Sequence, residues 1–206
     1  MEGTVLRFHK KSPLRQQPVC PHFGVCGGCK WQCLPYEEQI SWKQRQVMDN
    51  LIRIGKIELP ECSPILRSVQ TEEYRNKVEF SFANKVWKIF PDQHPEGLSP
   101  VVAEVPEDAP GAVGFHAGGA FDKILPIEEC HLMNPINNHI RNGIRDYCYR
   151  EGLSFHDARE HVGLMRSIMI RLSNSGELML LVQFCIKTEE EHAQAMCLME
   201  WIKQNY

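Results

Sequence analysis

The sequence contains no long apolar run and no internal repeat. None of its hydrophobic stretches approaches the ~20 consecutive residues that a helix needs to cross a membrane. The first ten residues, MEGTVLRFHK, also lack the apolar core of a secretory signal peptide. We therefore expect a cytoplasmic protein without a membrane span.

Cysteine, in contrast, is abundant, with nine residues in a chain of 206. Disulfides are rare in a reducing compartment, so clustered cysteines there indicate a metal or redox site. Cys20, Cys26 and Cys29 stand close together in CPHFGVCGGC, and the two glycines before Cys29 allow a tight turn. This triplet favours an iron–sulfur cluster over a zinc site, with unligated thiols as the third interpretation.

A metal centre of this kind needs a fourth ligand. Cys33 is the nearest cysteine, Cys130 is a distant one that follows an expected strand, and His22 is a further option for zinc. The remaining cysteines lie on or beside apolar segments and are predicted to be buried thiols: Cys62, Cys148, Cys185 and Cys197.

The charges are unevenly distributed along the chain. The formal net charge is −3, but residues 1–56 carry nine Lys and Arg against four Asp and Glu. The rest of the chain carries fourteen basic residues against twenty-two acidic ones. Such asymmetry is compatible with one basic face that meets an anion such as a phosphate backbone, and equally with an ordinary solvated surface.

Hydrophobic periodicity predicts three helices. The first begins at Pro35 and ends at Gly55, and its apolar stripe consists of Ile40, Val47, Leu51 and Ile54. The second is capped by Asn134, begins at Pro135 and buries Ile136, Ile140, Ile144 and Tyr147. The third opens with a capping box of Thr188 and Glu191 and reaches Trp201.

Alternating apolar and polar residues predict strands between these helices. We expect strands over 4–9, 74–82 and 86–90, two short strands within 113–127, and a hairpin of 163–173 with 177–185. Residues 91–111 indicate a long loop. The order of elements lacks regular βαβ alternation, which favours an α+β fold with a largely antiparallel sheet, flanking helices and an N-terminal cysteine-rich loop that binds a cluster.

Four blocks of this sequence, in this order, resemble the iron–sulfur RNA uracil-5-methyltransferases. They are CPHFGVCGGCKWQ, YEEQISWKQRQV, YRNKVEFSF and VGFH…FDKILPIEECHLMNP, and the resemblance extends over about residues 5–185. That family methylates C5 of uridines in 23S ribosomal RNA, and a related branch acts on tRNA. The resemblance implies a [4Fe–4S] cluster held by Cys20, Cys26, Cys29 and Cys130, and thereby favours Cys130 over Cys33.

The family's enzymes combine an N-terminal TRAM β-barrel, a central cluster-bearing domain and a C-terminal domain that binds S-adenosylmethionine. The resemblance implies that residues 1–17 are a remnant of the barrel and that 18–206 form the central domain. Within it, the helical segment 36–70 is expected to pack on a methyltransferase domain outside this sequence. No Asp-Pro-Pro-Arg-like segment and no strand–GxGxx–helix unit is present. We therefore expect no catalytic residue here, and S-adenosylmethionine binding only in a full-length enzyme.

These expectations define a function. The chain is predicted to be the RNA-recognition and cluster-bearing portion of a 23S rRNA uracil-5-methyltransferase, a transferase that is not catalytic in this portion alone. Arg75 and Lys77 in YRNK are the first candidates for RNA contacts, and Arg166 is a weaker one. Arg166 and Arg171 would lie on opposite faces of a regular strand.

Two other classes of protein are alternatives: a free-standing ferredoxin-like electron carrier and a zinc-binding interaction module. The apolar stripe of the first helix also predicts self-association through residues 36–54 if nothing covers it.

Overall fold

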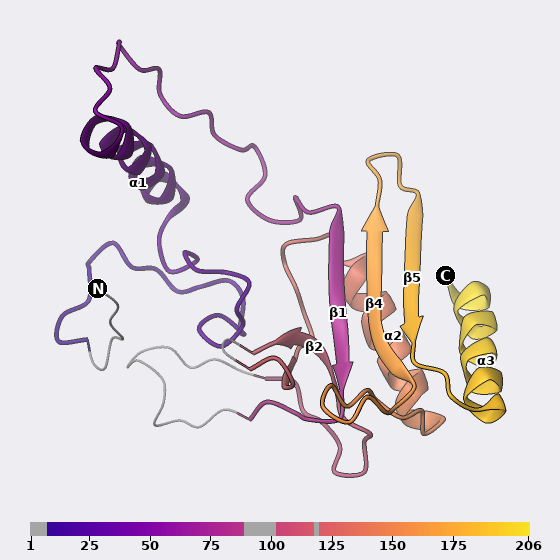
Figure 1. Cartoon of the computed structure of the whole chain (residues 1–206). Helices are drawn as coiled ribbons and strands as arrows, with labels where there is room; N and C mark the ends of the chain where they lie inside the picture. The colour runs from indigo at the N-terminus through magenta and orange to yellow at the C-terminus, as the bar shows by residue number, and fades with distance from the viewer. Residues whose placement is uncertain (1–7, 89–101, 118–119) are drawn as a thin grey trace.

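The computed structural model describes residues 8–88, 102–117 and 120–206 (Figure 1). Its helices are α1 (Tyr36–Asp49), continued by the short π-helix η1 (Asn50–Ile54), then α2 (Ile136–Arg150) and α3 (Glu189–Asn205). Its strands are β1 (Lys77–Ala83), β2 (Ala112–His116), β3 (Ile124–Pro126), β4 (Met165–Leu172) and β5 (Leu178–Phe184). None of the helices in the described ranges is both long and apolar enough to cross a membrane.

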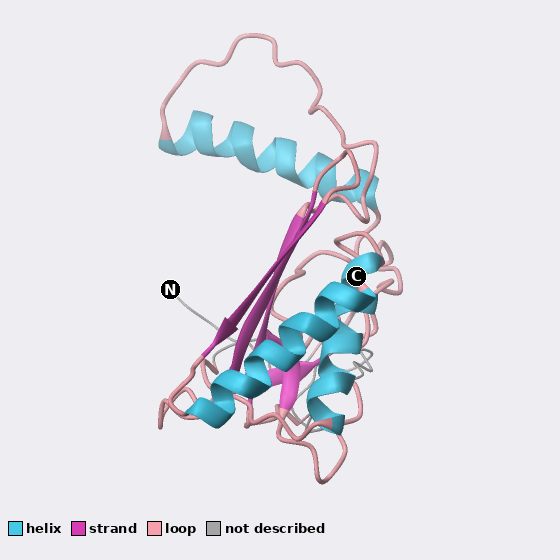
Figure 2. Ribbon diagram, turned by 90° about the vertical axis from the view of Figure 1, so that its right-hand side faces the viewer, coloured by secondary structure: helices cyan, strands magenta, loops and turns pink. Residues whose placement is uncertain are grey.

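The five strands form one sheet in the order β3-β2-β1-β4-β5, and every neighbouring pair is antiparallel. Helices α2 and α3 cover one face of this sheet, and within the described ranges the other face carries no helix (Figure 2). The α+β class and the largely antiparallel sheet predicted from the sequence are therefore confirmed.

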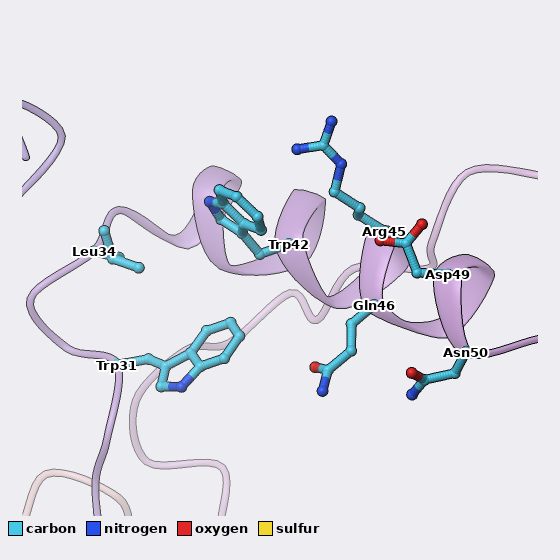
Figure 3. Close-up of a pocket in the computed structure, with 7 residues that line it drawn as sticks. All are labelled: Trp31, Leu34, Trp42, Arg45, Gln46, Asp49 and Asn50. Carbon is cyan, nitrogen blue, oxygen red and sulfur yellow. The ribbon is translucent and has the colours of Figure 1, made fainter. Parts of the chain in front are cut away.

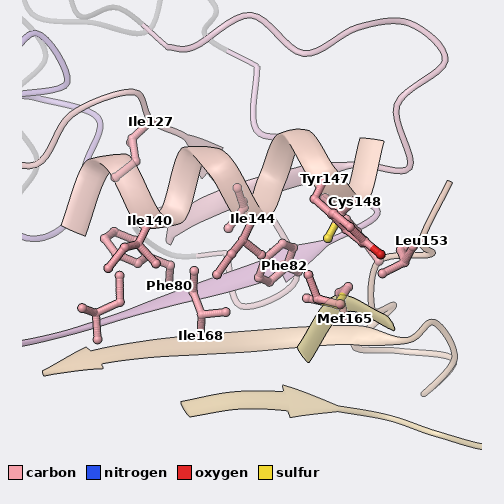
Figure 4. Close-up of a cluster of buried hydrophobic side chains, with 14 of the residues drawn as sticks. Phe80, Phe82, Ile127, Ile140, Ile144, Tyr147, Cys148, Leu153, Met165 and Ile168 are labelled. Carbon is pink, nitrogen blue, oxygen red and sulfur yellow. The ribbon is translucent and has the colours of Figure 1, made fainter. Parts of the chain in front are cut away.

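The hydrophobic core lies between the sheet and these two helices (Figure 4). Val78 and Phe80 of β1 alternate with polar residues, so their side chains point to the helical side, where Ile140 and Ile144 of α2 meet them. Phe80, Ile140 and Ile144 are completely buried. Burial of a side chain of this size stabilises the fold by about 1.5–3 kcal/mol each, so this layer fixes the sheet against α2.

Local signals in the sequence predict these helices and one hairpin well. Asn134 Oδ1 accepts from the Ile136 N–H at 3.0 Å, as expected of a cap. Thr188 and Glu191 form the reciprocal capping box. The hairpin of β4 and β5 turns at Gly176, whose φ of 88° lies in the left-handed region that favours glycine.

Helix α1 forms where the periodicity predicts it, but it lies away from the sheet (Figures 1 and 2). Neither α1 nor η1 contains a buried residue. Val47 is 57% exposed and Ile54 is 78% exposed. The apolar stripe is therefore not folded back onto the core of this structure.

Three expectations need correction or fall outside the described residues. Asn84 and Lys85 do not turn β1 into a hairpin, because Val86 forms a single parallel bridge with Ile124 while β1 pairs with β2 and β4. Cys62 and Cys197 are exposed, not buried, whereas Cys148 is buried as predicted. The strand over 4–9 and the loop over 91–111 fall largely outside the described ranges.

A candidate metal centre and nucleic-acid interface

The cysteine-rich loop packs against the end of β2. Its backbone turns at His22, whose carbonyl oxygen accepts from the Cys26 N–H at 3.0 Å, and Cys26 forms an antiparallel bridge with Ala117 directly after β2. Phe23 and Val25 are buried and anchor the turn. This anchoring brings the loop to the edge of the sheet that also carries β3.

Cys130 reaches the same place from the connection between β3 and α2. Its backbone N–H donates to Asn138 Oδ1 on α2 at 2.8 Å, so the first turns of that helix position it. Cys33 instead lies in the turn before α1, where its carbonyl oxygen accepts from the Gln16 N–H at 2.9 Å.

The four cysteines Cys20, Cys26, Cys29 and Cys130 lie within electrostatic range of one another. Burial, opposed by a backbone hydrogen bond from His22 and helped by the charges of the other three cysteines, raises the pKa of Cys20 to about 11. The pKa of Cys26 is raised first by burial and then by the charges of Cys29 and Cys130. The pKa of Cys130 is likewise raised by burial, and the charge of Cys29 adds to it.

No group of three or more His, Cys, Asp or Glu side chains within the described ranges is arranged to hold a metal ion. The predicted metal centre therefore remains a prediction. The donor chemistry nevertheless suits it, because all nine cysteines are free of disulfides and Cys20, Cys26, Cys29 and Cys130 lie near enough for their charges to influence one another. Four thiolates are the ligand set of a [4Fe–4S] cluster and of one class of structural zinc site.

Cations lie near two of the four cysteines. Lys30 lowers the pKa of Cys26, and Arg141 and Arg75 lower that of Cys130, although burial outweighs these effects. A nearby cation stabilises the thiolate that binds a metal. The raised pKa values favour the neutral thiols of Cys20, Cys26 and Cys130, and a bound metal would favour the thiolates.

Arg141 on α2 is the residue here that sequence reasoning missed. It is completely buried, and its guanidinium lies 4.8 Å from the ring centroid of Phe80. It donates to the Glu128 carbonyl oxygen, to Asn138 Oδ1 at 3.1 Å and to Asn142 Oδ1 at 3.0 Å, all of them neutral acceptors. The Glu128 carboxylate pairs with Arg145 instead, at 2.6 Å. A sequence signal existed, since Arg141 directly follows Ile140 and stands three residues before Ile144 of the predicted apolar stripe.

A hollow of about 630 Å³ opens beside the cysteine loop, and we call it the loop hollow. Its walls come from the loop, from α1, from residues 68–75 and from the start of the segment before α2. It contains three cations, one carboxylate and three aromatic side chains: Lys30, Lys43, Arg75, Glu72, Trp31, Tyr36 and Tyr74. Cations beside exposed aromatic rings are the arrangement with which proteins bind single-stranded nucleic acid.

The three arginine and lysine residues proposed as RNA contacts lie in different places. Arg75 lines the loop hollow, and its backbone N–H donates to the Leu132 carbonyl at 2.8 Å. Lys77 begins β1 on the sheet face without helices, directly opposite Arg171. Arg166 lies near the other end of that face, close enough to His156 to lower its pKa. The structure therefore does not bring these residues together at one point.

A second hollow, of about 460 Å³, lies along α1 (Figure 3). Trp31 and Leu34 from the cysteine-rich segment and Trp42 from the helix border it. Trp42 is 47% exposed. The helix residues that border it, Trp42, Arg45, Gln46 and Asp49, lie on the face of α1 opposite the apolar stripe, so this hollow is separate from the stripe.

Comparison with known proteins places these features in context. No family model matches the sequence. An RNA methyltransferase of Bacteroides thetaiotaomicron, described as uncharacterized, is 50% identical over 205 residues, which are 100% of this chain and 43% of that protein. A second, from Porphyromonas gingivalis, is 47% identical over 186 residues, covering 89% of this chain and 39% of the relative. This chain is homologous to proteins named RNA methyltransferases.

The chain spans less than half the length of these relatives. A solved structure has the same fold: the Pyrococcus abyssi tRNA (uracil-54, C5)-methyltransferase in complex with S-adenosyl-L-homocysteine, with a TM-score of 0.55 and 19% identity. The match covers 90% of this chain and 36% of that one.

Proposed function

We propose that this chain is the RNA-recognition and [4Fe–4S]-bearing portion of an S-adenosylmethionine-dependent RNA uracil-5-methyltransferase. The observation that supports the proposal is that Cys130 lies within electrostatic range of the loop cysteines, while Cys29 of that loop lines the loop hollow. Homology to RNA methyltransferases and the fold shared with a tRNA uracil-5-methyltransferase support it. The RNA we propose is 23S rRNA, with tRNA as the other candidate.

In this proposal Cys20, Cys26, Cys29 and Cys130 hold the cluster. The bound cluster links two segments that are a hundred residues apart in sequence, and metal ligation of this kind stabilises a fold. The residues of the chain supply the rest: Asn138 orients Cys130, and Lys30, Arg75 and Arg141 balance the negative charge of the thiolates.

The RNA binds, in this proposal, across the loop hollow. Lys30, Lys43 and Arg75 meet the phosphates, and the rings of Trp31 and Tyr74 stack on unpaired bases. Enzymes that modify a base take it out of its stack, so contacts to flanking nucleotides are needed to hold the RNA open.

Methylation at C5 of uracil needs a thiolate that adds at C6, a methyl donor and a base that removes the C5 proton. We propose that these groups lie outside the 206 residues, in the portion of the longer relatives that the chain does not match. The uncovered stripe of α1 is then the surface that meets this portion, or a second copy when the chain is alone. We expect labelled S-adenosylmethionine and unmodified rRNA to give no labelled RNA with this chain, and incorporation would contradict that division.

The cluster is tested by purifying the chain without oxygen and measuring iron, sulfide, zinc and the visible spectrum. About four irons and four sulfides per chain with a broad visible band support the proposal. One zinc and no iron would favour the zinc-binding module, and a cluster that cycles reversibly without RNA affinity would favour the electron carrier.

RNA binding is tested separately with a labelled RNA and the variants Arg75→Gln and Lys30→Gln. Each removes one cation of the loop hollow, and each should weaken binding and lower the salt dependence. Arg150→Gln, an exposed arginine at the end of α2, makes the same change in charge and should have little effect. Equal affinity of all variants would contradict the assignment of RNA to this hollow.

A further inference from the structure

A third hollow lies on the sheet face that carries no helix, and Arg166 is the one predicted RNA contact that lines it. Its volume is about 300 Å³. Ser81, Ser167 and Gln183 form one row across β1, β4 and β5, and side chains in register point to the same face. His116 at the end of β2 and His156 and His161 in the segment before β4 complete the walls, so we call it the histidine hollow.

A bulge in β4 directs a cation into this hollow. The register shifts between Met165 and Ser167, so Arg166 occupies the irregular position, and both Arg166 and Ser167 line the hollow. Arg171 pairs with Lys77 on the same face as Ser167. The expectation that Arg166 and Arg171 lie on opposite faces is therefore wrong, because the strand is not regular.

The cations of this face lack acidic partners. Among the residues that the structure describes, no carboxylate forms an ion pair with Arg166, Arg171 or Lys77. Lys77 and Arg171 are directly opposite each other, and like charges in such a pair repel. Asp122 in the hollow is already paired with Arg159. An anion that follows this face would relieve the repulsion.

The hollow also has unused hydrogen-bonding capacity. His156 is 8% exposed. Burial lowers its pKa and the nearby Gly163 backbone raises it, but its Nδ1 makes no hydrogen bond of good geometry with a described residue. Such atoms are rare in folded proteins, where buried polar groups are usually paired. Glu79 lines the hollow without an ion pair to any described residue and can accept from the N–H of a base.

An aromatic ring stands exposed at the hollow. Phe121 is 65% exposed, and the guanidinium of Arg159 lies 5.5 Å from its ring centroid. An exposed ring held by a cation offers one flat face, the kind of surface on which unpaired bases stack.

We propose that the histidine hollow binds one unpaired nucleotide of RNA, with its phosphate at Arg166 and its base against Phe121. This inference rests on the proposed RNA-binding function. It adds a second contact, separate from the loop hollow, on the open face of the sheet. Lys77 and Arg171 lie four residues away along the strands from Ser81 and Ser167, which is about 13 Å. One RNA strand can therefore contact both pairs.

The experiment measures the affinity of the chain for a short fluorescein-labelled oligouridylate by anisotropy, over a series of salt concentrations. We expect Arg166→Gln to weaken binding about fivefold and to lower the salt slope by about 0.7, the value for one phosphate on a single strand. Phe121→Ala should weaken binding about fivefold or more at an unchanged salt slope, because it removes stacking and no charge. Arg150→Gln is the matched control for charge and should change the affinity less than twofold.

Both side chains are exposed, so both variants should fold, and circular dichroism checks this. If the chain binds RNA and Arg75→Gln weakens it, but Arg166→Gln and Phe121→Ala behave like Arg150→Gln, the nucleotide assignment is overturned and the proposed function stands. A loss in only one of the two variants also overturns it, because the assignment needs both ends. If the wild-type chain does not bind RNA, both proposals fail.

Discussion

Replacing Arg141 tests the candidate metal centre without changing any cysteine. Its guanidinium is fully buried and donates to neutral oxygens, and burial lowers its pKa from 12.5 to about 10. At ~1.4 kcal/mol for each tenfold change, this fall corresponds to about 3 kcal/mol against the charged form. The charge of Cys130 acts in the opposite direction and raises the pKa of Arg141. Metal-bound thiolates would therefore offset the cost of burying this cation.

We expect Arg141→Met to release its metal to a chelator about ten- to a hundredfold faster than the wild-type chain, the usual effect of losing a group that supports the ligands. The substitution removes the positive charge beside Cys130 and one of the hydrogen bonds that hold Asn138. Asn138 in turn accepts from the Cys130 backbone, so the ligand also loses its orientation. The assay is the rate at which visible absorbance, or bound zinc, is lost after chelator is added.

Arg145→Met is the matched control. Arg145 is on the same helix, but its guanidinium pairs with the carboxylates of Glu128 and Asp146. We expect its metal release to stay within about threefold of wild type, because the hydrogen bonds of Arg145 go to Glu128, Asp146 and Asn142 and not to Cys130 or Asn138. Arg141→Lys keeps the charge and should recover part of the retention. Equal release rates for wild type and a folded Arg141→Met would refute the reasoning, and if that variant does not fold, faster release from Arg141→Lys than from Arg145→Met is the outcome required.

Three further predictions follow from the structure. Cys130→Ser should abolish metal binding and Cys33→Ser should spare it, which the iron or zinc content of each variant decides; loss in Cys33→Ser alone would reverse the assignment. Burial raises the pKa of Cys20 from 9.0 to about 11, so the folded metal-free chain holds this proton more tightly than the unfolded chain. Its free energy of unfolding, from urea titrations, should fall as the pH rises from 9 towards 11, and less so in Cys20→Ser; equal pH dependence would contradict this. Leu51→Glu on η1 should change the stability by no more than about 0.5 kcal/mol and reduce any self-association seen by sedimentation, because η1 contains no buried residue, whereas unfolding would show that the stripe is core.

Most of the secondary structure was predictable because its signals are local. The capping box at Thr188, the turn at Gly176 and the cap at Asn134 each depend on residues within a few positions, and all three are present. The pairing of the strands was less predictable, because it depends on residues far apart in the sequence. The Asn84-Lys85 turn failed because β1 lies in the middle of the sheet, and its partners β2 and β4 come from distant parts of the sequence.

The residues of the candidate metal centre differ in how well the sequence predicts them. The short spacing of the loop cysteines predicts a metal site, whereas only the family resemblance selects Cys130 over Cys33. The structure places Cys130 within electrostatic range of the loop cysteines, and Asn138 on α2 binds its backbone N–H there, over a separation that no local pattern encodes. Arg141 escaped notice because an arginine in an amphipathic helix is normally read as part of its solvated face.

The bulge in β4 changes the face of the sheet to which the side chain of Arg166 points. In a regular strand Arg166 would face away from Arg171, and Lys77 and Arg171 would leave the paired cations at one end of the open face only. The register shift after Met165 instead lets Arg166 share that side with Ser167 and Arg171. Bulges of this kind commonly redirect a side chain next to a functional site. The sheet can therefore present cations at both ends of its open face while its other face stays committed to the core.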